Sequence, residues 1–168
     1  MTYSDDYLYS KDIDWFCIIN GIFVHIASAG GILPEEVNDR EKLRKNQYLV
    51  NQMDDIFNDN QIVLNRFFLH ERFGKNVGSE ENIMNYLESF ISMSRKGFVS
   101  LDRTNLEDPN DNTYHIVCMP NKIITLQCEF NLCKYKSNDP NLLNYIGQNI
   151  SLLEEITLLL IIIVIVNR

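Results

Sequence analysis

The sequence predicts an α+β fold in which helices back a mostly antiparallel sheet. Strand-like and helix-like segments are segregated along the chain, which is typical of this class rather than of alternating α/β folds. An Asn20-Gly21 pair between two apolar runs predicts an N-terminal β-hairpin. A capped amphipathic segment at 79–96 predicts a central helix. We expect a flexible arm over residues 1–11 and a single domain over residues 12–168.

The hairpin spans Asp14 to Ala27, and we expect the rest of the chain to pack around it. Asn and Gly tolerate the positive φ angles of a type I′ turn, and a two-residue loop fixes the register of the strands. Because side chains alternate between faces, one face is entirely apolar and should lie in the core. That face consists of Trp15, Cys17, Ile19, Ile22, Val24 and Ile26.

The second face of the hairpin is less polar than a strand that faces water usually is. It carries Asp14, Phe16, Ile18, Phe23, His25 and Ala27. We therefore expect a helix or a partner protein to cover part of it.

Two helices are indicated by their end signals. Pro34 suits the first position of a helix, and apolar residues continue at helical spacing to about Phe57. Ser79 caps a second helix, which ends near Lys96 before a glycine. The segment Ile62 to Phe73 fits a helix or a strand, and its period of about 3.6 residues favours a helix.

The C-terminal half predicts three antiparallel strands followed by helices. The strands are Phe98–Leu101, Thr113–Met119 and Lys122–Tyr135, the last two forming a second hairpin, and a short helix covers Asn141–Gln148. The last segment, Ile156–Val166, is nearly all apolar and would span about 16 Å as a helix, about half a hydrocarbon core. A buried closing helix is favoured, while a strand, a membrane contact and self-association are alternatives.

Composition bounds the partners and the compartment. The 168 residues contain 15 Lys and Arg against 23 Asp and Glu, a formal charge of -8, which disfavours binding to nucleic acid and anionic lipid. No signal peptide is visible at the N-terminus, so we expect a cytoplasmic protein. Four cysteines lie in apolar segments without a Cys-x-x-Cys motif, which favours free thiols over a disulfide or a metal site.

The small residues after the hairpin are candidates for ligand binding. Ser28, Gly30 and Gly31 precede a predicted helix, and bare backbone amides at such a place attract anions. The spacing matches neither a P-loop nor a dinucleotide-binding motif, and acidic Glu35 and Glu36 follow. A tight turn that lets the chain pass close to the hairpin is therefore the favoured interpretation.

The candidate catalytic residues are His25, Asp102, Arg103 and His115. If the two predicted hairpins share a sheet, these side chains converge on one edge, and a carboxylate that orients a histidine is common in acid–base catalysis. The alternative is one surface ion pair and two half-buried histidines.

No complete catalytic, cofactor or metal signature is present. We therefore expect a non-enzymatic protein-interaction module, and no cofactor. The alternatives are a small hydrolase or transferase that uses a His/Asp pair, and a membrane-associated protein that uses the apolar segment Ile156–Val166.

Overall fold

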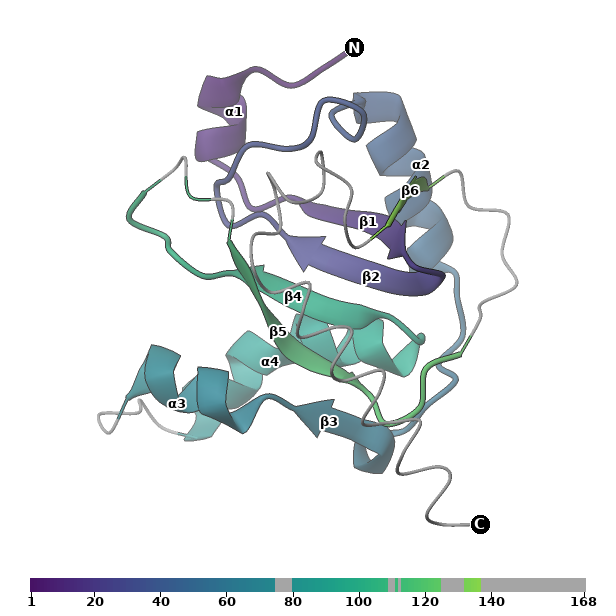
Figure 1. Ribbon diagram of the computed structural model, residues 1–168, viewed down its shortest axis with the longest axis vertical. Helices are drawn as coiled ribbons and strands as arrows, with labels where there is room; N and C mark the ends of the chain where they lie inside the picture. The colour runs from purple at the N-terminus through teal and green to yellow at the C-terminus, as the bar shows by residue number, and fades with distance from the viewer. Residues whose placement is uncertain (75–79, 109–110, 112, 125–131, 137–168) are drawn as a thin grey trace.

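The computed structural model describes residues 1–74, 80–108, 111, 113–124 and 132–136. These residues form one sheet with the strand order β3-β5-β4-β2-β1-β6 (Figure 1). The strands are β1 (Asp14–Ile19), β2 (Ile22–Ala27), β3 (Ile62–Leu64), β4 (Val99–Arg103), β5 (Tyr114–Pro120) and β6 (Cys133–Tyr135). The helices are α1 (Asp5–Tyr9), α2 (Arg40–Asn51), a 3-10 turn η1 (Asp59–Gln61), α3 (Arg66–Phe73) and α4 (Glu80–Arg95). The predicted α+β class is confirmed.

The first hairpin has the predicted turn and register. Asn20 and Gly21 both have positive φ angles, 49° and 83°. Trp15 pairs with Ile26, Cys17 with Val24 and Ile19 with Ile22. Trp15 and Val24 are fully buried. Local turn chemistry and the alternation of apolar residues were therefore sufficient to define this element.

The rest of the sheet is mixed rather than built from two hairpins. β4 pairs with β2 in parallel and with β5 in antiparallel orientation. β6 pairs in parallel with β1, at the far edge of the sheet from β3. The prediction that Thr113–Met119 and Lys122–Tyr135 form a second hairpin is wrong for Cys133–Tyr135, because the open edge of β1 provides its backbone partner.

One face of the sheet packs against helices, as expected for the second face of the hairpin. In Figure 1, α4 lies behind β4 and β5. Two apolar clusters fill this interface. Their buried members are Phe16, Phe23, Val50, Phe98 and Leu132 near α2, and Ala27, Phe68, Leu87, Phe90, Val117 and Cys118 near α3 and α4.

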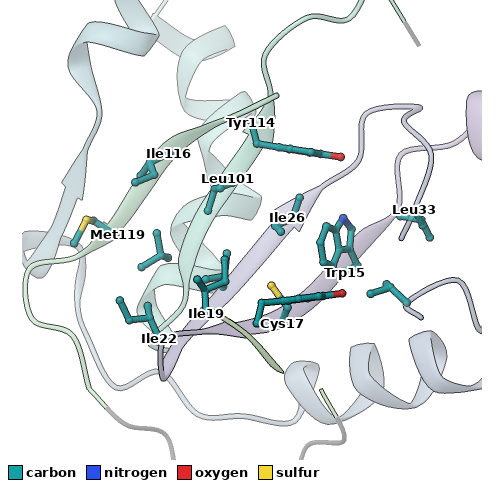
Figure 2. Close-up of a cluster of buried hydrophobic side chains, with 14 of the residues drawn as sticks. Trp15, Cys17, Ile19, Ile22, Ile26, Leu33, Leu101, Tyr114, Ile116 and Met119 are labelled. Atoms are coloured by element: carbon teal, nitrogen blue, oxygen red, sulfur yellow. The ribbon is translucent and has the colours of Figure 1, made fainter. Parts of the chain in front are cut away.

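The opposite face carries the largest apolar cluster. It includes the predicted core row of the hairpin and its continuation on β4 and β5, with Leu101, Tyr114, Ile116 and Met119 (Figure 2). Leu8 of α1 and Leu33 of the loop after β2 join the cluster from outside the sheet. Leu8, which belongs to the expected flexible arm over residues 1–11, is fully buried and packs onto the body of the protein.

Two predicted helix boundaries are wrong. α2 begins at Arg40 rather than Pro34, because Asp39 caps the amides of Glu41 and Lys42 while Pro34 starts a turn. It ends at Asn51 rather than near Phe57.

The segment 62–73 forms a short strand followed by a helix. β3 covers its first three residues, and Asn65 then caps α3 through a bond to the amide of Phe68. The helix predicted at 79–96 is confirmed as α4. Cys128 and the predicted segments Asn141–Gln148 and Ile156–Val166 lie outside the described residues.

Candidate functional site

A chain of polar side chains lies between the sheet and α4, and His25 is at its centre. His25 is 1% exposed. Its Nε2 lies 3.1 Å from Asp14 Oδ1, and its Nδ1 lies 3.3 Å from Ser100 Oγ. The sheet creates this arrangement, because His25 pairs with Ser100 on β4 and with Phe16, two residues after Asp14, on β1.

This chain of polar side chains continues from Ser100 into the interior. Ser100 Oγ donates to the carbonyl of Phe90 at 3.1 Å and accepts from Ser94 Oγ at 3.3 Å. Ser94 Oγ in turn lies 3.3 Å from Cys118 Sγ. Burial raises the pKa of the Cys118 thiol to about 12. The chain of polar side chains therefore ends in a neutral thiol.

The Asp14, His25 and Ser100 side chains resemble the composition of a hydrolytic triad but not its geometry. In a triad the serine hydroxyl donates its proton to the histidine, which makes the oxygen nucleophilic. Here Ser100 donates to the Phe90 carbonyl instead. Ser100 and Ser94 are also fully buried. The arrangement therefore satisfies buried polar groups and does not present a nucleophile.

Asp102 forms a second polar group on the same face of the sheet. Tyr86 Oη donates to its Oδ2 at 2.6 Å, Arg72 Nη2 lies 3.5 Å away, and the amide of Arg103 donates to Oδ1 at 2.8 Å. Burial raises the pKa of Asp102, and these three donors oppose that shift. Burial and the neighbouring carboxylate raise the pKa of Tyr86.

His115 is the strand partner of Asp102 but has its own contacts. The two residues pair across β4 and β5. The imidazole stacks on Phe68, with ring centroids 5.1 Å apart, and Nδ1 is hydrogen-bonded to Thr104 Oγ1. Burial lowers the pKa of His115. The hypothesis placed His25, Asp102, Arg103 and His115 together on one edge of the sheet. His25, Asp102 and His115 instead share one face of three inner strands, and the hydrogen bonds above join each of them to different partners.

The Arg103 side chain lies on the opposite face of the sheet and donates hydrogen bonds to two loops. Its side chain is 1% exposed. Nε donates to the carbonyl of Asp111 at 3.0 Å, Nη1 to Ala29 at 3.4 Å, and Nη2 to Asp108. All these acceptors are backbone carbonyls, so the guanidinium links the loop after β2 to the loop after β4.

The loop proposed to bind a ligand donates its amides within the protein. The amide of Ser28 donates to Ile13, that of Gly30 to Lys11 and that of Gly31 to Ser28. The Ala29 amide donates to Asp12 Oδ1 at 2.7 Å, and Ser28 Oγ accepts from Ile13. An anion would have to compete with these bonds, so the geometry favours the tight-turn interpretation.

Sequence reasoning missed Asp14, Ser94, Ser100, Tyr86 and Arg72. The contact of Asp14 with His25 could have been predicted, because the predicted hairpin register already places the two residues diagonally opposite each other on one face. Ser94 lies four residues after Phe90 on the buried stripe of α4, and a serine in such a stripe indicates a buried hydrogen bond.

An open hollow of about 450 Å³ lies at the C-terminal end of α4. Its lining residues are Asp55, Ile56, Phe57, Asn58, Asp59, Gln61 and Arg95. The amides of Ile56 and Phe57 donate to the Arg95 carbonyl at 2.8 and 2.9 Å, which holds this segment against the helix end. Arg95 Nη2 lies 2.6 Å from Asp59 Oδ1, and this bond lowers the pKa of Asp59.

Comparison with known proteins found no matching family model, no similar curated protein and no similar solved structure. Among the residues that the structure describes, no group of three His, Cys, Asp or Glu residues could hold a metal ion. The candidate functional regions of the described residues are the buried chain of polar side chains around His25 and the open hollow at the end of α4.

Proposed function

We propose that the protein is a non-enzymatic interaction module that binds a basic protein partner through the hollow at the end of α4. The observation that carries this proposal is an exposed apolar side chain with two carboxylates beside it in the lining of an open hollow. Ile56 is 50% exposed there, and Asp55 and Asp59 have side chains that are 48% and 68% exposed.

The chemistry of the hollow favours a lysine or arginine side chain. Such a side chain has an aliphatic stem that can cover Ile56 and a charged head that can reach Asp55. The carbonyl end of a helix adds partial negative charge at the same place. Asp59 is paired with Arg95 at 2.6 Å, whereas the ion pair of Asp55 with Lys96 Nζ is longer, at 3.9 Å. Asp55 is therefore the carboxylate more available to a partner. The formal charge of -8 supports attraction of a basic surface at long range.

A site-specific photo-crosslinker tests this proposal. A benzophenone side chain at position 56 should capture one protein in the native cell, and the adduct should weaken when Asp55→Asn is added. Leu106 is a matched control, because it is also 50% exposed. Equal adduct patterns from positions 56 and 106, or no adduct from position 56, would contradict the proposal.

A small hydrolase or transferase is the second candidate, because His25 lies between a carboxylate and a serine hydroxyl. A fluorophosphonate probe, which labels serines activated by a histidine, tests this candidate. We expect no labelling of Ser100, because its proton is donated to a carbonyl and its side chain is buried. Labelling that disappears in Ser100→Ala would establish the enzymatic alternative.

Three further expectations stay predictions. Membrane association and self-association depend on Ile156–Val166, outside the described residues; within the described part, no helix is long and apolar enough to cross a bilayer. Detergent-free fractionation and light scattering test them. Cytoplasmic localisation is supported by the free thiols of Cys17, Cys118 and Cys133, and fluorescence microscopy of the tagged protein tests it.

A further inference from the structure

Two free cysteines face each other across the edge of the sheet. Cys17 on β1 is the register partner of Cys133 on β6, and the two strands are parallel. Both side chains belong to the same apolar cluster, so they lie on the same face of the sheet. Both are free thiols.

The spacing of paired strands suits a disulfide. Neighbouring strands lie about 4.7–4.9 Å apart, and disulfides join residues whose Cα atoms are about 4.4–6.8 Å apart. β6 is a three-residue strand at the edge of the sheet. A small shift of β6 can therefore bring the two sulfur atoms together without disturbing the central strands.

The two thiols differ in their surroundings. Cys17 is fully buried, and its pKa is raised by that burial. Cys133 is partly exposed, and Lys42 Nζ donates to its Sγ at 3.5 Å. The Cys133 thiol also points at the carbonyl of Glu36, 3.7 Å away. A partly exposed cysteine beside a positive charge reacts with an oxidant in solution, whereas a fully buried thiol does not meet that oxidant. Cys133 is therefore the cysteine oxidised first, and Cys17 is placed to react only with its strand partner.

We propose that Cys133 is a site of oxidation by peroxides and that the stable product is an intramolecular disulfide with Cys17. In the first step, the Cys133 sulfur attacks one peroxide oxygen; the O–O bond breaks, Cys133 becomes a sulfenic acid, and hydrogen peroxide is reduced to water. In the second step, the Cys17 sulfur attacks the Cys133 sulfur; the S–O bond breaks, and the hydroxyl group leaves with the Cys17 proton as a second water. The disulfide then fixes β6 to β1.

Intact mass spectrometry and non-reducing peptide mapping of the full chain, titrated with hydrogen peroxide, test this proposal. A Cys128→Ser background excludes Cys128 as a partner. We expect loss of two hydrogen atoms, a peptide that links Cys17 to Cys133, and reversal by dithiothreitol. In Cys17→Ser, dimedone should trap a sulfenic acid at Cys133. Lys42→Met should slow oxidation by about fivefold, because one nearby positive charge is lost.

Matched variants keep the result interpretable. Cys118 is the control thiol, because it is buried on the helix face beside Ser94, and Cys118→Ser should leave the Cys17–Cys133 link unchanged. Lys45→Met, at an exposed position of the same helix, should leave the oxidation rate unchanged. Addition of oxygen atoms to Cys133 without a link to Cys17, a link to another residue, or equal reactivity of Cys133 and Cys118 would overturn the proposal.

Discussion

Nε2 of His25 lies 3.1 Å from Oδ1 of Asp14, across the first hairpin. This contact joins a carboxylate with a side chain 34% exposed to an imidazole that is almost fully buried. Both faces of the hairpin therefore lie in the interior of the protein. One face packs in an apolar cluster, and the other contributes to the chain of polar side chains under α4. The contribution of these polar side chains to the free energy of unfolding can be measured.

The first prediction concerns His25 itself. His25→Ala leaves a cavity and removes the hydrogen-bond partner of Ser100 and Asp14. We expect it to lower the free energy of unfolding by about 3 kcal/mol, measured by urea denaturation. His70 on α3 is exposed, so His70→Ala should change the free energy by less than about 0.5 kcal/mol. Similar small effects at both positions would show that the polar chain contributes little.

The second prediction concerns the link between loops made by Arg103. Arg103→Met keeps most of the apolar stem but leaves the carbonyls of Ala29, Asp108 and Asp111 without this donor. We expect a loss of about 3 kcal/mol in urea denaturation. Arg103→Lys should recover only part of it, because an ammonium cannot reproduce the planar fork. Arg44→Met, at an exposed site on α2, should have little effect; full recovery by lysine would contradict the role of the fork.

The elements that the sequence predicted correctly depend on local signals. The first hairpin is determined by two turn residues and an alternating pattern, and α4 by its end signals and apolar stripe. The boundary of α2 was missed because two start signals compete. Pro34 suits a helix start, but Asp39 satisfies two otherwise unpaired amides and defines the real one.

The pairings that build the sheet could not be predicted in the same way. β2 pairs with β4 across more than seventy residues, and β1 with β6 across more than a hundred. No local pattern specifies such partners. The polar site around His25 could be predicted only in part. The Asp14–His25 contact follows from the hairpin register, whereas the contact between His25 and Ser100 requires the parallel pairing of β2 with β4.

The third prediction uses the lowered pKa of His115. Burial disfavours its charged form, so in the range below about 6.5 the unfolded chain binds this proton more readily than the folded protein does. The contribution of His115 to stability is therefore complete above about pH 6.5 and is lost as the pH falls toward the lower folded-state pKa. Unfolding free energies at pH 7.5 and pH 5.5 should differ more in the wild type than in His115→Gln. His70→Gln, at an exposed histidine, is the control; an unchanged pH dependence in His115→Gln would refute the prediction.

The fourth prediction separates two kinds of glycine. A Cβ added at Gly21 would meet no atom within 4 Å, so Gly21→Ala is penalised only by its φ angle of 83°. We expect a loss of about 1 kcal/mol. A Cβ at Gly31 would lie 2.9 Å from the Ser28 carbonyl oxygen and 3.3 Å from Arg103 Nη1. Gly31→Ala should therefore cost more, about 2 kcal/mol, because backbone atoms have to move.

Asparagine distinguishes the two causes. Asn tolerates positive φ better than Ala does, so Gly21→Asn should recover part of the stability lost in Gly21→Ala. At Gly31 the limitation is space, and Gly31→Asn should be less stable than Gly31→Ala because the side chain is larger. Urea denaturation of the four variants measures both differences. A gain from asparagine at position 31 would mean that the close approach between Gly31, Ser28 and Arg103 does not limit what that loop can hold.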